Sequence, residues 1–356
     1  MDSRIADARR KLGSSTILLG HHYQRDEVIR FADFTGDSYK LSKAAAETDA
    51  RYILFCGVHF MAESADILAH DGQQVILPDL NAGCSMADMA EISQVEACWE
   101  ALSHLGFSDE IVPITYMNST AAIKAFCGEH GGLVCTSSNA RSAFEWAFAR
   151  GQRILFLPDQ HLGRNTGKAI GIPLEQMPLW DPSKRLGGSN AKTLQNSRVI
   201  LWHGFCSVHK RFTVGQIQAA RQRFPEVRVI VHPECPMPVV DAADASGSTD
   251  YITKAIAAAP AGSTFAIGTE INLVQRLANQ NPQHKIFCLD SVVCPCSTMY
   301  RIHPSYIAWV LEALTRGQVL NRITVPEEVA IPARVALERM LSLRPAPSVE
   351  SAVISA

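Results

Sequence analysis

Residues 15–24 read STILLGHHYQ, a short apolar run that ends in a cluster of polar residues. A run of this length, bounded by polar and small residues, is typical of a buried strand. The same layout recurs along the whole chain, at 51–60, 74–84, 111–119, 132–140, 153–163, 198–206, 227–235, 263–273 and 285–296. The chain is therefore predicted to contain many short strands, each followed directly by polar residues.

Helical segments lie between these strands. The candidates are residues 39–49, 119–128, 138–150, 212–224 and 270–280. Several of them open on Ser, Thr, Asp or Asn, which cap helix N-termini. Alternating strands and helices build parallel sheets covered by helices, and ligands gather where the C-terminal ends of the strands meet the following loops. The sequence thus predicts an α/β fold with its functional residues in the polar clusters.

The length of the chain indicates more than one domain, because 356 residues exceed the size at which a single hydrophobic core keeps growing. The strand segments fall into three stretches of similar layout. We therefore expect three similar three-layer αβα domains with parallel sheets around a pseudo-threefold axis, and the active site at the centre. The expected domains are 1–88, completed by helices within 299–345, then 89–206 and 207–298, with 346–356 as a loose tail.

The composition is that of an ordinary globular protein, with 47% hydrophobic and 19% charged residues and a formal net charge of −2. Such a balance argues against a nucleic-acid partner, which normally requires a basic face. The first residues, MDSRIADARRKLG, lack the apolar stretch of a signal peptide, and no apolar run reaches membrane-spanning length. We expect a cytoplasmic protein without a membrane partner, in which the ten cysteines stay reduced.

Three cysteines, one in each third of the chain, follow apolar runs: Cys84, Cys206 and Cys296. Small metal modules use close pairs of cysteines, whereas dispersed thiols indicate a site assembled at a common centre. Three thiolates on an iron–sulfur cluster would leave one iron without a protein ligand, free to act as a Lewis acid. Cys294 is so close to Cys296 that it remains an alternative third ligand.

The chain resembles the quinolinate synthases of NAD biosynthesis through motifs that occur in family order. They are HHYQ (21–24), GDSYKLS (36–42), AGCSMAD (82–88), YMNS (116–119), CTSSNA (135–140), LPDQHLGRN (157–165), HGFCSVH (203–209), HPEC (232–235), GST (247–249), IGTE (267–270) and CSTMYRI (296–302). The resemblance implies an enzyme that condenses iminoaspartate with dihydroxyacetone phosphate to give quinolinate, phosphate and two waters. It also implies a [4Fe-4S] cluster with three Cys ligands, Cys84, Cys206 and Cys296, and one open iron.

The resemblance further implies a set of substrate-binding residues at strand ends and turns. They are His21, Ser38, Tyr116, Met117, Asn118, Ser137, His232, Glu234 and Thr249. Hydroxyl side chains at helix N-termini suit carboxylates and phosphates, because the backbone N–H groups there are free to donate. For the Ser and Thr residues, plain helix capping is the alternative interpretation.

Proton transfer is expected from Glu234, Tyr23 and His209, with Glu234 as the principal base. Histidine exchanges protons near neutral pH, and a carboxyl group with a raised pKa can serve as a base. The resemblance places His209 beside the cluster and assigns proton shuttling to Tyr23 and Glu234.

Other classes of protein remain as alternatives. A [4Fe-4S]-dependent hydro-lyase acting on another small carboxylic acid would use the same Lewis-acid chemistry. A cluster-bearing redox sensor would normally carry a partner-binding segment, and a structural zinc protein would prefer closely spaced ligands. The pathway that the resemblance implies also requires an L-aspartate-oxidising enzyme to supply the imine, and functional coupling to it is expected.

Overall fold

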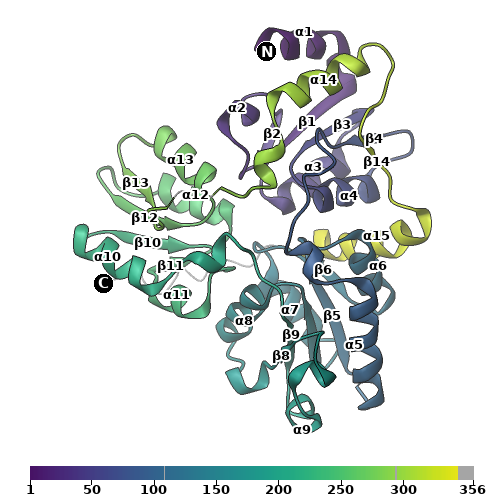
Figure 1. Ribbon diagram of the computed structural model, residues 1–356, viewed down its shortest axis with the longest axis vertical. Coiled ribbons are helices and arrows are strands. Elements are labelled where there is room, and N and C mark those ends of the chain that lie inside the picture. Colours follow the sequence, from purple (N-terminus) through teal and green to yellow (C-terminus); the bar gives the residue numbers. More distant parts are fainter. Residues whose placement is uncertain (108, 293–294, 344–356) are drawn as a thin grey trace.

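The computed structural model describes residues 1–107, 109–292 and 295–343, and its described part is an α/β structure with three separate sheets. Figure 1 shows three lobes grouped around a common centre, each with its own sheet and flanking helices. The expectation of an α/β fold built from three similar αβα units is confirmed. The exact threefold relation and the domain boundaries stay predictions.

The first lobe contains a five-stranded sheet in the order β14-β4-β3-β1-β2, parallel except for β14. Its strands are β1 (Thr16–His21), β2 (Phe34–Gly36), β3 (Tyr52–Cys56), β4 (Gln74–Ile76) and β14 (Arg322–Ile323). The helices of this lobe are α1 (Asp2–Leu12), α2 (Asp26–Ile29), α3 (Ser38–Glu47), α4 (His59–Leu68) and α14 (Pro304–Leu314). The chain thus returns to its first lobe after completing the third, because α14 packs on α1 and β14 pairs with β4.

The second lobe contains an all-parallel sheet in the order β6-β5-β7-β9-β8. Its strands are β5 (Ile111–Tyr116), β6 (Leu133–Cys135), β7 (Arg153–Leu157), β8 (Leu179–Trp180) and β9 (Val199–Trp202). The accompanying helices are α5 (Ile92–His104), α6 (Ala121–Glu129), α7 (Ala140–Phe148), α8 (Gln160–Ala169) and α9 (Ala191–Gln195). Every residue of β5 is buried, as expected for a strand with helices on both faces of its sheet.

The third lobe contains a four-stranded parallel sheet in the order β11-β10-β12-β13. Its strands are β10 (Arg228–Val231), β11 (Ala245–Ser246), β12 (Thr264–Gly268) and β13 (Lys285–Cys288). The helices are α10 (Val214–Arg223), α11 (Met237–Ala242), α12 (Thr249–Ala257) and α13 (Ile271–Gln280).

The five helices predicted from the sequence, which are spread over all three lobes, are all present, with ends that differ from the predicted ones by a few residues.

The last helix, α15 (Glu327–Ser342), packs mainly on α6 and β6 of the second lobe and also on α4 of the first. The approach to α6 is close: a Cβ on Gly128 would lie 1.9 Å from the carbonyl oxygen of Pro332. Arg339 donates to the Gly132 carbonyl at 2.6 Å. The sequence predicts that helices within 299–345 complete the first domain, which stays a prediction; in the structure α15 contacts both the first and the second lobe. The expected tail, 346–356, lies outside the described residues.

Candidate active site

The three lobes turn the C-terminal ends of their strands toward one central pocket, whose walls surround about 680 Å³ of space, including the part open to solvent. Residues of all three lobes line it: His21, Tyr23, Asp37, Ser38, Val58, Phe60, Met61, Cys84, Met86, Tyr116, Asn118, Thr136, Ser137, Cys206, Val208, His209, His232, Glu234, Thr249, Glu270, Cys296, Thr298 and Met299. The strand ends singled out in the sequence therefore meet in space.

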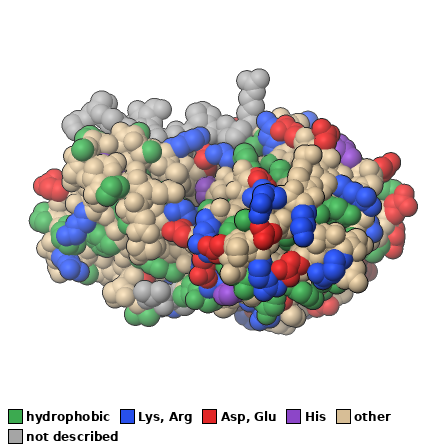
Figure 2. All heavy atoms as spheres, turned by 90° about the horizontal axis from the view of Figure 1, so that it is seen from above, with side chains coloured by type: hydrophobic (Ala, Val, Ile, Leu, Met, Phe, Trp, Pro, Cys, Tyr) green, Lys and Arg blue, Asp and Glu red, His purple; other side chains and the backbone are tan. Residues whose placement is uncertain are grey.

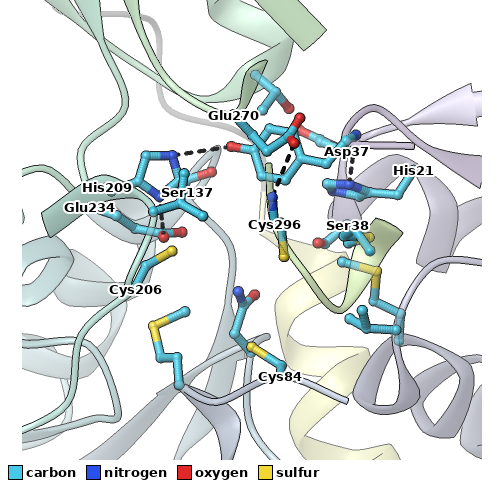
Figure 3. A pocket seen from close by; sticks show the side chains of 18 of the residues that line it. His21, Asp37, Ser38, Cys84, Ser137, Cys206, His209, Glu234, Glu270 and Cys296 are labelled. Carbon is cyan, nitrogen blue, oxygen red and sulfur yellow. Dashed lines mark hydrogen bonds and ion pairs between the residues drawn. The ribbon is translucent and has the colours of Figure 1, made fainter. Parts of the chain in front are cut away.

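Cys84, Cys206 and Cys296 line the pocket from three different directions (Figure 3). Each occupies the same local turn. The amide four residues further on donates to the carbonyl oxygen of the cysteine, at 3.2 Å for Cys84, 3.0 Å for Cys206 and 2.9 Å for Cys296. A 3-10 helix begins three residues after each one, over Ala87–Met89, His209–Arg211 and Met299–Arg301. The sequence predicts the repeat from the layout of the strands alone. The structure shows that the backbone around the three cysteines repeats as well.

The surroundings of two of these thiols, Cys84 and Cys206, keep them protonated when no metal is bound. Burial raises the pKa of Cys84 to about 12, and the backbone N–H groups of Ala87 and Met86 oppose it only in part. Burial also raises the pKa of Cys206 well above its ordinary value, and the nearby Glu234, Cys84 and Cys296 add to that rise. A bound metal would deprotonate such thiols outright, because its charge dominates the site. Buried thiols of this kind suit metal ligation better than nucleophilic catalysis.

Glu234 and His209 form the polar centre of the pocket wall. His209 Nδ1 lies 2.8 Å from Glu234 Oε2, and the Tyr116 hydroxyl donates to Glu234 Oε1 at 2.6 Å. Burial acts to raise the pKa of the Glu234 carboxyl, but the imidazole of His209 and the hydrogen bonds from His209 and Tyr116 outweigh burial and hold it below its usual range. The expectation of a base with a raised pKa is therefore wrong for Glu234, which is ionised at neutral pH.

Tyr23 reaches the same centre from the first lobe. Its hydroxyl lies 2.8 Å from Thr269 Oγ1 and 3.4 Å from His209 Nε2, and His209 Nε2 lies 3.1 Å from Thr269 Oγ1. Burial, reinforced by the charge of Glu234, raises the pKa of Tyr23 well above its ordinary value. The phenol is thus protonated, and a chain of polar groups runs from Tyr23 through His209 to Glu234.

The rings of His21 and His232 are both neutral, and each accepts a hydrogen bond from the backbone amide two residues further on. The amide of Tyr23 donates to His21 Nδ1 at 3.1 Å, and the amide of Glu234 donates to His232 Nδ1 at 3.4 Å. Burial lowers the pKa of His232 to about 3, and burial with nearby positive charge lowers that of His21 well below its ordinary value. A neutral ring that accepts at Nδ1 carries its proton on Nε2, so each presents a hydrogen-bond donor.

Ser38 and Thr249 are not helix caps. The capping side chains belong to their neighbours: Asp37 accepts from the Lys40 amide in α3, and Ser248 accepts from the Tyr251 amide in α12. The hydroxyls of Ser38 and Thr249 line the pocket instead, at the first residues of their helices. Free backbone N–H groups at such helix starts favour anions.

Two buried oxygen atoms of the pocket, Asn118 Oδ1 and Thr249 Oγ1, have no hydrogen-bond partner among the described residues. Buried polar groups are costly unless they are paired. A polar ligand would supply the missing partners. Ser137, from the loop before α7, lines the same pocket.

The pocket brings together all of the expected site residues except Met117. The Met117 side chain is fully buried, with its sulfur 3.3 Å from Ser64 Oγ, and it does not line the pocket. Only its backbone supports the site, through a bond from its amide to Cys135 O at 2.7 Å. Cys294, the alternative third ligand, lies outside the described residues.

Sequence reasoning missed Glu270, a buried carboxyl at the end of β12 that lines the pocket. Burial raises its pKa to about 7, although backbone N–H groups, first among them that of Cys296, oppose the rise. Asp37 and Thr269 were missed as well. The available signal was position, because all three lie within motifs that the sequence had already singled out, and Thr269 and Glu270 also follow a predicted strand.

Comparison with known proteins decides the family. The model of the family described as "Quinolinate synthetase A protein" matches residues 3–342. The "Quinolinate synthase" of Corynebacterium glutamicum is 68% identical over 344 residues, which cover 96% of this chain and 87% of that protein. The chain belongs to the quinolinate synthase family.

Further relatives agree with this membership. The "Quinolinate synthase" of Acidobacterium capsulatum is 63% identical over 97% of this chain and 93% of its own length. That of Streptomyces coelicolor is 56% identical over 96% of this chain and 88% of its own length. These relatives are named as enzymes, and so high an identity over nearly the whole chain identifies this member of the family as an enzyme too.

One subset of the pocket offers a different kind of metal site. Ligand atoms of Cys206, His209 and Glu234 lie within 4.8 Å of one another, a group that could hold a single ion. In the structure, however, His209 and Glu234 are already hydrogen-bonded to each other at 2.8 Å. A single ion there would also leave the matching turns of Cys84 and Cys296 without a role.

Proposed function

We propose that the protein condenses iminoaspartate with dihydroxyacetone phosphate, releasing phosphate and two waters, and so forms quinolinate. Membership of the family supports the activity. The single observation that carries the chemistry is the convergence of three cysteines, in three equivalent turns, on a pocket lined with neutral N–H and O–H donors. A dicarboxylate and a phosphate ester need such donors.

The proposed cofactor is a [4Fe-4S] cluster held by Cys84, Cys206 and Cys296, with one open iron. The donor set fits it, because the three thiols line one pocket and each comes from a different lobe. When bound, the cluster would supply a Lewis acid that polarises a substrate oxygen. The other steps fall to the side chains of the protein.

Substrate binding is proposed for the groups that are neutral donors or lie at helix starts. His21 and His232 each carry an Nε2–H, and Ser38, Ser137 and Thr249 add hydroxyls. The orphaned oxygen of Asn118 would receive a hydrogen bond from the substrate. Because the rings are neutral, they orient carboxylates by hydrogen bonds and not by a full positive charge.

Proton transfer is proposed for Glu234, His209 and Tyr23. Glu234 is ionised and can accept a proton, while Tyr23 is protonated and can donate one. His209 contacts both, so it can pass a proton from one to the other. At neutral pH the two groups hold opposite protonation states, which suits Glu234 as the proton acceptor and Tyr23 as the proton donor.

The cellular compartment and the enzyme that supplies the imine are also proposals. No helix in the described ranges is both long and apolar enough to cross a membrane. On the face seen in Figure 2, Lys and Arg side chains alternate with Asp and Glu and form no broad patch of one sign. We place the enzyme in the cytoplasm, coupled to an L-aspartate-oxidising enzyme that supplies the imine. A hydro-lyase acting on another acid is the less favoured alternative, because the relatives share the quinolinate synthase name.

An anaerobic assay tests this proposal. Iminoaspartate, generated in place from L-aspartate by an oxidising enzyme, is mixed with dihydroxyacetone phosphate and the purified protein. We expect quinolinate and inorganic phosphate to appear in equal amounts. Replacing the phosphate ester by dihydroxyacetone is the control and should give no phosphate. Failure to form quinolinate with iron-loaded protein would favour the hydro-lyase alternative.

The His209→Gln variant tests the proton chain through its pH dependence. We expect kcat to fall by roughly 10²-fold, the usual order for loss of a proton-transfer group. The imidazole lowers the pKa of Glu234, so its removal raises that pKa. Activity needs ionised Glu234, so the acidic limb of the kcat profile should move to higher pH.

The matched control for that experiment is His130→Gln. His130 follows α6, bonds Phe126 O at 2.9 Å and does not line the pocket. Its profile should coincide with that of the parent enzyme. An unmoved acidic limb in His209→Gln would show that His209 does not set the pKa of Glu234.

A further inference from the structure

The motif IGTE, residues 267–270, ends in a carboxylate that the proposed chemistry does not use. Glu270 is fully buried and lies between β12 and α13, facing the pocket (Figure 3). Its side chain accepts from the amide of Asn272 through Oε2 at 2.7 Å, which caps α13. A helix cap, however, needs only one of the two carboxylate oxygens.

The second oxygen of Glu270 reaches the cysteine loop. Oε1 accepts from the backbone amide of Cys296 at 3.2 Å. The same oxygen accepts from the Asn272 side chain at 2.9 Å. The Cys296 sulfur in turn lies 3.4 Å from Thr298 Oγ1. Glu270 thus ties the segment that carries the proposed third ligand to the sheet of the third lobe.

The same unit extends to the first lobe. The Asn272 side chain donates to the Tyr23 carbonyl at 3.3 Å, and Thr269 Oγ1 lies 2.8 Å from the Tyr23 hydroxyl. The turn 269–272 therefore supports both Cys296 and Tyr23. Metal ligands commonly depend on such outer hydrogen bonds for their orientation.

We propose that Glu270 is a positioning residue that holds Cys296 in its ligand position by accepting its backbone amide. The inference rests on the proposed function, because it takes Cys296 to be a cluster ligand. It adds to that function a residue that binds no metal itself yet governs how firmly the metal is held.

Two substitutions separate this role from helix capping. Glu270→Asp keeps a preferred capping residue but shortens the side chain by one methylene, so the carboxylate draws back from Cys296. Glu270→Gln keeps the length and one oxygen, so the bond to the Cys296 amide can persist while one capping acceptor is lost. A purely capping role predicts that Gln does more harm than Asp, and the positioning role predicts the reverse.

The measurement is the anaerobic release of iron to a chelator, followed with the electron paramagnetic resonance spectrum of the reduced protein. We expect Glu270→Asp to release iron about tenfold or more faster than the parent, and to show altered g values. Glu270→Gln should stay close to the parent. Glu63→Asp is the control, because Glu63 accepts the Ala121 amide at the start of α6 at 3.1 Å without being bonded to a ligand cysteine.

The outcomes separate this inference from the proposed function. Parental iron retention and spectrum in Glu270→Asp, or greater loss in Glu270→Gln than in Glu270→Asp, would overturn the positioning role alone. A parent protein that binds no iron would refute the proposed function and, with it, this inference.

Discussion

Replacing Glu234 by Gln should lower kcat by roughly 10²-fold or more while the protein keeps its iron and its visible spectrum. The carboxylate is held ionised by His209 and Tyr116, and both of these side chains are hydrogen-bonded to it. Gln has the same shape and can still accept from the Tyr116 hydroxyl, but it cannot take up a proton. The loss should therefore appear in kcat and much less in KM.

The control for this substitution is Glu145→Gln on the outer surface of α7, where the carboxylate forms an exposed ion pair with Arg141 at 2.9 Å. It should behave like the parent enzyme in both kcat and iron content. Turnover within a few-fold of the parent in Glu234→Gln would remove Glu234 from the mechanism, and the base would then have to be sought elsewhere in the pocket.

The alternation of strands and helices was sufficient to predict the α/β class, because the strands β1, β3, β4, β5, β6, β7, β9, β10, β12 and β13 lie in apolar runs with clear polar ends. The short strands β2, β8, β11 and β14 were not expected. Each has two or three residues and lies outside the apolar runs that indicated the other strands. They pair because neighbouring strands offer free edges, which is a tertiary effect.

The position of α15 also could not be predicted. Nothing local in the sequence places this helix against α6, yet Gly128 allows the two backbones to approach closely. A glycine can occur within a helical sequence for several reasons. Here only the packing of α15 shows that the reason is close approach of the two backbones.

Most of the candidate pocket was predictable, because its residues follow strands and the C-terminal ends of parallel strands meet. The failures have a common cause. The pKa of Glu234 depends on His209 and Tyr116, which come from other parts of the chain. Glu270 looks like an ordinary helix cap until its second oxygen is seen to accept from Cys296. Met117 shares a motif with Tyr116 and Asn118, but alternation along an extended segment turns its side chain into the core.

We propose that one cysteine from each lobe holds a common iron–sulfur cluster. The most direct test is the iron and acid-labile sulfide content of anaerobically purified protein, measured beside Cys84→Ser, Cys206→Ser and Cys296→Ser. Cys98→Ser is the control, because Cys98 is buried in α5 and does not line the pocket. We predict about four irons per chain in the parent and the control, as a [4Fe-4S] cluster requires, and their loss in each of the three variants. An iron-free parent, or full iron retention after any one of the three substitutions, would contradict the account.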